Sequence, residues 1–162
     1  MTVEELADPL HKQTVPVTGE GVIQPRICEA LDSLAARRQI GAQFGRPGQR
    51  HGAILFYQSH GCCAGSAPMC FTERELALGP GDRLLGRLDG APDGVPVYAS
   101  EAQCDYLAGL AMTLDVAPGD SGSFGLEDGS GRHFVAHFRL WTDEEVARLA
   151  PIEWALPGRG AP

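Results

Sequence analysis

Three cysteines lie within nine residues of this 162-residue chain, and no other part of it concentrates reactive side chains so closely. Cys62 and Cys63 are adjacent, Cys70 follows seven residues later, and His60 stands just before them. Thiolates are soft ligands that suit zinc, copper(I), iron and iron–sulfur clusters. We therefore expect the segment to hold a metal ion (iron, zinc or copper) or an iron–sulfur cluster through four ligands: Cys62, Cys63, Cys70 and His60.

The residues around the cysteines favour a tight loop that brings thiols together. Gly61 and Gly65 permit sharp turns, and Pro68 stiffens the return of the chain. Because such centres usually have four ligands, distant histidines are further candidates: His51, His133 and His137. Polar residues that we expect to line the same pocket are Gln58, Ser59, Ser66, His137 and Arg139, the last two of which share one face of a predicted strand.

The cysteines have other interpretations, which the sequence leaves open. Cys70 and one of the adjacent pair would form a reversible disulfide if the segment is a redox device. One thiolate would be a nucleophile if His60 or His137 acts as its base. A third interpretation is that the cysteines pack as small apolar groups.

Hydrophobic spacing predicts the elements that position this loop. Ile27, Leu31, Leu34 and Ala35 fall on one face of a helix over residues 25–38. The apolar run over residues 53–59 predicts a buried strand that ends at the cysteines. Ser100 and Gln103 predict a capped helix, and Thr142 with Glu145 predicts another that stops at Pro151. The remaining predicted elements are strands over 82–88, 95–99, 111–117, 123–127 and 133–140, and the first capped helix spans 101–109.

Composition narrows the class of protein. Glycine (21) and proline (12) make up about a fifth of the chain, which favours short strands and many turns. The net charge of −8 argues against nucleic acid or an anionic membrane as a partner. No apolar run is long enough for a membrane helix, and the acidic start lacks the features of a signal peptide. We therefore expect a cytoplasmic protein, where clustered cysteines favour metal or redox chemistry over structural disulfides.

The order of elements predicts an α+β fold. We expect a small β-rich domain with an N-terminal helix and short peripheral helices. Its expected organisation is a loose leader over residues 1–24, one domain over 25–154 and a tail over 155–162. Small β-rich domains with exposed strand edges commonly pair, so we expect a homodimer.

The chain resembles the bacterial domain-of-unknown-function family 779 over about residues 50–146. The resemblance is strongest in the motif that runs from His51 through the cysteine loop: His51-Gly, Phe56, Gln58-Ser59, Gly61-Cys62-Cys63, Gly65-Ser66 and Pro68-Met69-Cys70. Members are often encoded beside aldehyde dehydrogenases. The resemblance thus implies an accessory role in aldehyde or alcohol metabolism, with an aldehyde dehydrogenase as the partner.

A second resemblance is to the A-type iron–sulfur carriers of the HesB-like fold. It rests on the order of short segments: Gly61-Cys62-Cys63-Ala64-Gly65, Asp82, Tyr106-Leu107-Ala108-Gly109, Leu114-Asp115 and Gly122-Ser123-Phe124. Residues 133–139 stand where the carriers have a C-terminal Cys-Gly-Cys. This resemblance implies a HesB-like sandwich or half-barrel and a ligand role for the first cysteine.

Three functions follow as expectations. The first is a small metal-binding protein that accompanies a dehydrogenase and holds its metal in the cysteine loop. The second is a small metal- or thiolate-dependent enzyme that acts on an aldehyde-derived molecule, with His137 and Arg139 in its pocket. The third is a non-catalytic dehydrogenase partner whose cysteines are structural.

Overall fold

A computed structural model describes residues 23–38, 54–61, 66–73, 75–88, 95–107, 109–120, 125–149 and 153–156. The predicted leader up to residue 22, His51, the two adjacent cysteines Cys62 and Cys63, and the end of the predicted tail lie outside these residues. No helix among the described residues is long and apolar enough to cross a membrane.

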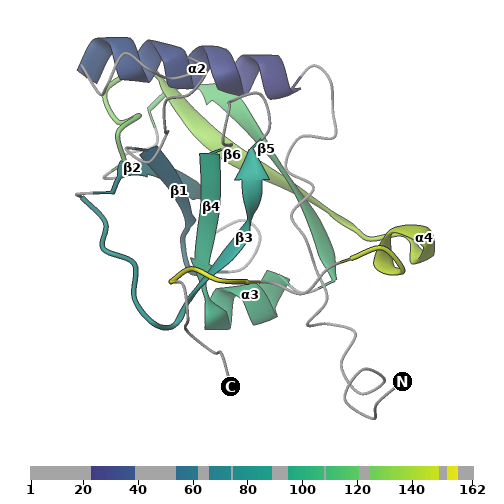
Figure 1. The fold of residues 1–162 in the computed structure, drawn as a ribbon. Helices are drawn as coiled ribbons and strands as arrows, with labels where there is room; N and C mark the ends of the chain where they lie inside the picture. Colours follow the sequence, from purple (N-terminus) through teal and green to yellow (C-terminus); the bar gives the residue numbers. More distant parts are fainter. Residues whose placement is uncertain are drawn as a thin grey trace, which may run out of the picture.

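The fold is α+β, as predicted, with one long helix, a five-stranded sheet and a two-stranded ribbon (Figure 1). The described strands form no closed barrel. In chain order the elements are α2 (Ile23–Arg38), β1 (Ile54–Gln58), β2 (Pro68–Thr72), β3 (Asp82–Leu88), β4 (Val95–Ser100), α3 (Glu101–Leu107), β5 (Leu110–Pro118), β6 (Arg132–Leu140), α4 (Asp143–Val146) and β7 (Glu153–Trp154).

The five-stranded sheet has the order β2-β1-β4-β3-β7. Strand β1 pairs antiparallel with β2 and parallel with β4, so the cysteine loop leaves the sheet at the same end as α3, which follows β4. A bulge between Leu84 and Gly86 interrupts the pairing of β3 with β4. Strands β5 and β6 pair along their whole length, from Leu110 opposite Leu140 to Pro118 opposite Arg132.

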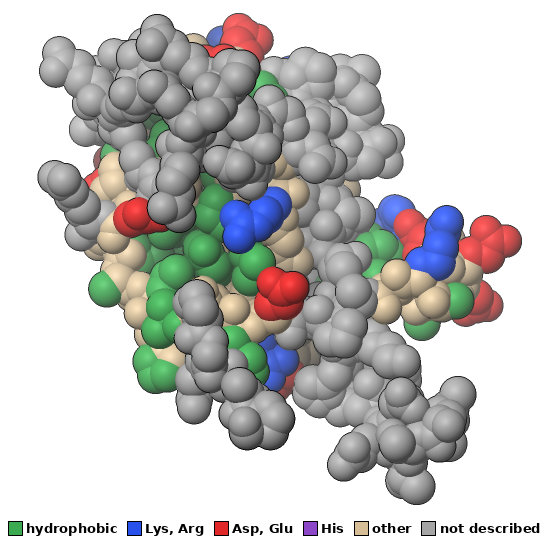
Figure 2. All heavy atoms as spheres, viewed as in Figure 1, with side chains coloured by type: hydrophobic (Ala, Val, Ile, Leu, Met, Phe, Trp, Pro, Cys, Tyr) green, Lys and Arg blue, Asp and Glu red, His purple; other side chains and the backbone are tan. Residues whose placement is uncertain are grey.

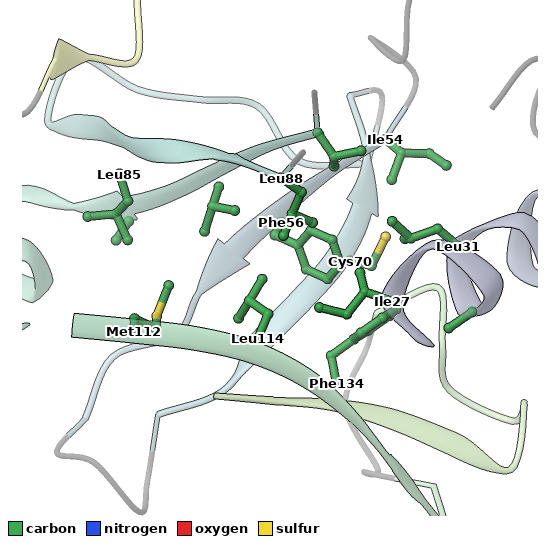
Figure 3. Packing of buried hydrophobic residues seen from close by; sticks show 14 of the residues in the cluster. Ile27, Leu31, Ile54, Phe56, Cys70, Leu85, Leu88, Met112, Leu114 and Phe134 are labelled. Atoms are coloured by element: carbon green, nitrogen blue, oxygen red, sulfur yellow. The ribbon is translucent and has the colours of Figure 1, made fainter. Parts of the chain in front are cut away.

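The core lies between the sheet, the ribbon and α2. The predicted helical spacing is confirmed at Ile27, Leu31 and Leu34, which are all buried. Phe56 of β1 meets Phe134 of β6 edge to face, with 4.8 Å between ring centroids, and this contact joins the sheet to the ribbon (Figure 3). Alternation along β6 predicts Phe134, Ala136, Phe138 and Leu140 on one face. The first three pack in or against the core, whereas Leu140 at the end of the strand is 74% exposed.

The opposite face of the sheet is also largely apolar. Register places Tyr57, Met69, Leu84 and Tyr98 on this outer face, where each is half-buried. Figure 2 shows hydrophobic side chains gathered over the sheet on that side of the molecule. Apolar residues on both faces explain why β1 reads as a continuous hydrophobic run rather than an alternating one.

Several element predictions were wrong. Residues 125–130 form turns instead of the end of a strand over 123–127, since Gly129 and Gly131 adopt positive φ angles that do not continue a strand. The last predicted helix ends at Val146, well before Pro151, although the capping box of Thr142 and Glu145 is present as predicted. Strand β2 was not predicted, since its sequence begins with proline and was assigned to the loop. The two-residue β7 was also missed.

Candidate functional site

Hydrogen bonds fix the end of the β1–β2 hairpin, which is the base of the cysteine loop. The Ser59 N–H donates to the Ala67 carbonyl at 2.9 Å, and the Ala67 N–H donates to Ser59 Oγ at 2.8 Å. These two bonds extend the hairpin past the last residue of β1. The four residues 62–65 therefore connect two anchored ends, Gly61 and Ser66.

Gln103 of α3 holds one of these ends directly. Its Oε1 accepts the Gly61 N–H at 3.1 Å, and its Nε2 donates to the Gly61 carbonyl at 2.9 Å. Ser100 caps α3 as predicted by accepting the Gln103 N–H at 3.1 Å. The Gln103 side chain, however, reaches across to the loop instead of closing a capping box with Ser100.

Ser66 holds the other end. Its hydroxyl donates to the Ser59 carbonyl at 2.5 Å and accepts from the amides of Gln58 at 2.7 Å and Gln103 at 3.3 Å. Because the hydroxyl uses both lone pairs and its proton, it fixes the orientation of both amides. We call Gln58, Ser66 and Gln103 the amide frame.

The amide frame is buried. Gln58 has no exposed surface, and Gln103 is 3% exposed. Buried polar groups are costly unless they are hydrogen-bonded, so the frame commits three polar side chains to holding the loop. Gln58 Oε1 has no hydrogen-bond partner among the described atoms, which leaves one buried acceptor directed away from Ser66. The frame thus fixes the residues on either side of Cys62 and Cys63.

Cys70 does not lie at the loop. It has no exposed surface, stands opposite Phe56 in the hairpin register, and its side chain lies near Leu31 and Phe56 in the core (Figure 3). It follows Ala67 by three residues, which is about 10 Å along an extended strand. Burial raises the pKa of the Cys70 thiol well above its usual range, and nearby Glu127 adds to the shift. The position of this thiol in the core, three residues past the loop base at Ala67, argues against a ligand role.

The backbone of Cys70 is held by a turn on the far side of β2. The Cys70 N–H donates to Glu127 Oε2 at 3.1 Å, and the Leu126 N–H donates to the Cys70 carbonyl at 2.8 Å. Glu127 is itself only 3% exposed. This carboxylate therefore takes the place of a neighbouring strand at the outer edge of β2.

The histidines are dispersed. His60 is exposed and stands one residue before Gly61, as a loop ligand would require. His133 Nδ1 lies 2.7 Å from the Gly119 carbonyl, and His137 Nε2 lies 3.5 Å from Asp115 Oδ2. Both belong to the ribbon. His133 lines a pocket with Ala30 and Leu34 of α2, whereas Gly61 at the start of the loop bonds to Gln103 of α3.

Asp115 of β5 is a paired residue. It forms an ion pair with Arg26 of α2, which also donates to the Val116 carbonyl at 3.0 Å. Burial works to raise the pKa of Asp115, but hydrogen bonds from the Val116 N–H and from Arg26 outweigh it, and the pKa is lowered. His137 thus belongs to a ribbon-and-helix cluster and not to the amide frame.

Arg139, the other predicted pocket residue on β6, also has its own partner. Its guanidinium binds both carboxylate oxygens of Glu145, at 2.8 and 2.7 Å, and lies over the Trp141 ring. Arg139 and the Thr142 N–H lower the pKa of Glu145 to about 2. The structure therefore brings Gln58, Ser59 and Ser66 together and places His137 and Arg139 elsewhere.

Within the described residues, no group of three or more His, Cys, Asp or Glu side chains is arranged to hold a metal ion. Cys62 and Cys63, the centre of the predicted ligand set, lie outside those residues. Two important residues were not singled out from sequence. Gln103 was identified only as a weak cap, and Glu127 was placed in a strand that does not form. The sequence signal for either is its place in a segment that resembles the domain-of-unknown-function family 779, residues 103–106 for Gln103 and 124–127 for Glu127.

The family model described as Domain of unknown function (DUF779) matches residues 46–140, which is more than half of the chain and includes the loop, the amide frame and Glu127. The chain belongs to the DUF779 family. The matched segment of this DUF779 protein begins after α2, so the helix that covers its core lies outside the match. A search of curated proteins found no match, and a search of solved structures found none. The resemblance to HesB-like carriers therefore stays a prediction.

Proposed function

We propose that this DUF779 protein binds a thiophilic metal through Cys62 and Cys63, with His60 as the adjacent third ligand. The observation that supports the proposal is the amide frame, which fixes both ends of the segment that carries the two cysteines. A metal site requires ligands that are held in place by a surrounding shell of hydrogen bonds. Cys70 is left out of this ligand set because its sulfur packs in the core.

Two thiolates and one imidazole suit zinc, copper(I) or iron, and they leave one position for an exchangeable ligand. An iron–sulfur cluster requires cysteine ligands from elsewhere, for example from a second chain. The family resemblance adds the proposal that the protein is cytoplasmic and serves an aldehyde dehydrogenase.

Metal analysis of protein purified without an affinity-tag metal and without oxygen tests the proposal. We expect about one metal ion per chain after zinc, iron or copper(I) is supplied. Cys62→Ser and Cys63→Ser should each lose the metal, while Cys104→Ser, a buried thiol in α3, should retain it as the matched control. Failure of the full chain to retain any of the three metals overturns the proposal.

Cys70→Ser separates the two possible ligand sets. We expect this variant to be less stable, because it places a hydroxyl in the core, but to retain metal. If folded Cys70→Ser loses metal while Cys104→Ser retains it, Cys70 is a ligand. That result would contradict the ligand set of Cys62, Cys63 and His60. Aldehyde turnover that requires Cys62 but no metal supports the thiolate enzyme instead.

A further inference from the structure

The last described segment of the chain lies along the side of β3 that faces away from β4. Strand β7 pairs Trp154 with Arg83, and the Ala155 N–H donates to the Asp82 carbonyl at 2.9 Å. Figure 1 shows this segment, in yellow, passing the start of β3. We call residues 153–155 the strap. A two-residue strand at the edge of a sheet has few bonds to hold it, and such segments open at a smaller cost in free energy than the core does.

The strap covers a charged side chain. The Arg83 guanidinium lies over the Trp154 ring, 4.4 Å from its centroid, and the Arg83 side chain is only 11% exposed. Arg83 Nη2 donates to Glu101 Oε1 at 2.7 Å, whereas Arg83 Nε is buried without a hydrogen-bond partner among the described atoms. A buried guanidinium is costly unless its surroundings stabilise it. The Trp154 ring and the Glu101 carboxylate provide that stabilisation here.

Glu101 begins α3, the helix that holds the loop base. Its N–H donates to the Gly81 carbonyl at 2.8 Å, so its backbone and its carboxylate both tie the start of α3 to the start of β3. Two residues later, Gln103 makes both hydrogen bonds to Gly61. A helix of seven residues is marginal on its own, so the position of α3 depends on such tertiary contacts. A continuous set of contacts thus joins the strap to the loop base through Arg83 and α3.

We propose that the strap fixes the loop base when it is docked. In that state Trp154 keeps water from one side of the Arg83 guanidinium, and the ion pair with the half-exposed Glu101 is stronger than it would be in water. The start of α3 is then held, and Gln103 stays in place at Gly61. When the strap opens, water reaches the guanidinium, the ion pair weakens and the loop base loosens.

The consequence for metal binding rests on the proposed function. A looser loop base holds Cys62 and Cys63 less firmly, so opening of the strap should lower their affinity for metal. Coupling between two sites is reciprocal, so bound metal should favour the docked strap by the same factor. The strap thereby sets how firmly the loop retains its metal.

Hydrogen exchange at the Gly61 amide tests the inference without any metal. In the metal-free full chain, Trp154→Ala should speed exchange of the Gly61 N–H at least threefold and leave the amides of the β5–β6 ribbon unchanged. Trp154→Phe keeps an aromatic face for Arg83 and should stay within twofold of the wild type. Trp141→Ala is the matched control, because Trp141 lies beside Arg139, which also has a carboxylate partner. This control should not affect Gly61.

A second variant tests the route through α3. In a Glu101→Gln background the ion pair is already lost, so adding Trp154→Ala should change exchange at Gly61 by less than a further twofold. The inference is overturned if the full effect of Trp154→Ala persists in that background. It is also overturned if Trp154→Ala alone leaves Gly61 unchanged or speeds the ribbon amides equally.

Zinc titrations separate this inference from the proposed function. Trp154→Ala should weaken zinc binding at least threefold, Trp141→Ala should leave it unchanged, and zinc should slow exchange of the Ala155 N–H in the wild type. A chain that responds at Gly61 but binds neither zinc, iron nor copper(I) overturns the proposed function and leaves the role of the strap intact. Equal zinc affinities of the wild type and Trp154→Ala overturn the coupling to metal, whereas the metal site itself stands.

Discussion

The side-chain amide of Gln103 pairs with the backbone of Gly61 much as a neighbouring strand would, accepting its N–H and donating to its carbonyl. Gly61 adopts a backbone φ of 129°, a value that residues other than glycine rarely adopt. Gly61 lies past the end of β1. Its N–H and carbonyl are therefore hydrogen-bonded by a side chain of α3 and not by a neighbouring strand. The hydrogen-bond network continues from Gln103 to Ser66 on the far side of the loop.

Gln103→Ala should destabilise the protein by about 1–3 kcal/mol, because it leaves the Gly61 groups and Ser66 short of partners. Urea unfolding at neutral pH measures the loss. The same variant should weaken metal binding at the loop, since Cys62 directly follows the released Gly61. Asp105→Ala, an exposed change on the same helix, is the control and should be nearly neutral. Equal effects of the two substitutions would contradict a role for the amide frame.

Gly125→Ala should destabilise the turn that supports β2. A Cβ at Gly125 would lie 2.0 Å from Glu127 Oε1, so the carboxylate must leave its place and release the Cys70 N–H. We expect a loss of about 1–3 kcal/mol in the free energy of unfolding. Gly81→Ala, where a Cβ meets nothing within 4 Å, should be near neutral.

A double-mutant cycle separates this clash from a general sensitivity of the turn. In a Glu127→Ala background the Gly125→Ala change has no carboxylate to displace, so its additional cost should fall below about 0.5 kcal/mol. Strict additivity of the two substitutions would show that the carboxylate is not the cause.

The ion pair of Asp115 with Arg26 should make stability depend on acid pH. The pKa of Asp115 is lowered in the folded protein, so its contribution is complete above the unfolded pKa of about 4 and is lost as pH falls through the folded value. Urea unfolding should show wild type more stable than Asp115→Asn by about 1 kcal/mol or less at pH 7, since Arg26 is half-exposed. The gap should narrow by pH 3. A gap that widens in acid would contradict the assignment.

The buried thiols should resist alkylation. Burial, with a smaller opposing effect of Arg83, raises the pKa of Cys104 to about 12, so at pH 8 only about one part in ten thousand is thiolate. Cys70 is more deeply buried. Peptide mapping after iodoacetamide treatment of folded protein should find both unmodified, and urea should expose both. Rapid labelling of Cys70 in the folded protein would show that β2 opens readily.

Sequence patterns located the regular elements well. Hydrophobic periodicity indicates which face of an element is buried. It did so for α2, through Ile27, Leu31 and Leu34, and for most of β6. The strand over residues 82–88 and the capping box of Thr142 were confirmed for the same local reason. These predictions needed no knowledge of distant partners.

The site depended on tertiary contacts that spacing does not encode. Cys70 lies close to Cys63 in sequence, yet the strand period turns its side chain into the core, opposite Phe56. Gln103 and Gly61 are 42 residues apart, and only the parallel pairing of β1 with β4 brings them together. The Glu127 carboxylate replaces a strand at β2, an arrangement without any periodic signal.

Other parts of the same chain lie along the outer edge of β2 and along β3 in the five-stranded sheet. Leu126 and Glu127 satisfy β2 at Cys70, while β7 pairs with β3 and places Trp154 over the Arg83 guanidinium at 4.4 Å. A second copy that paired with β2 at Cys70 would first have to displace the turn that carries Leu126 and Glu127. The edge of β2, one of the exposed edges that the homodimer expectation relied on, is therefore already closed at Cys70 by the same chain.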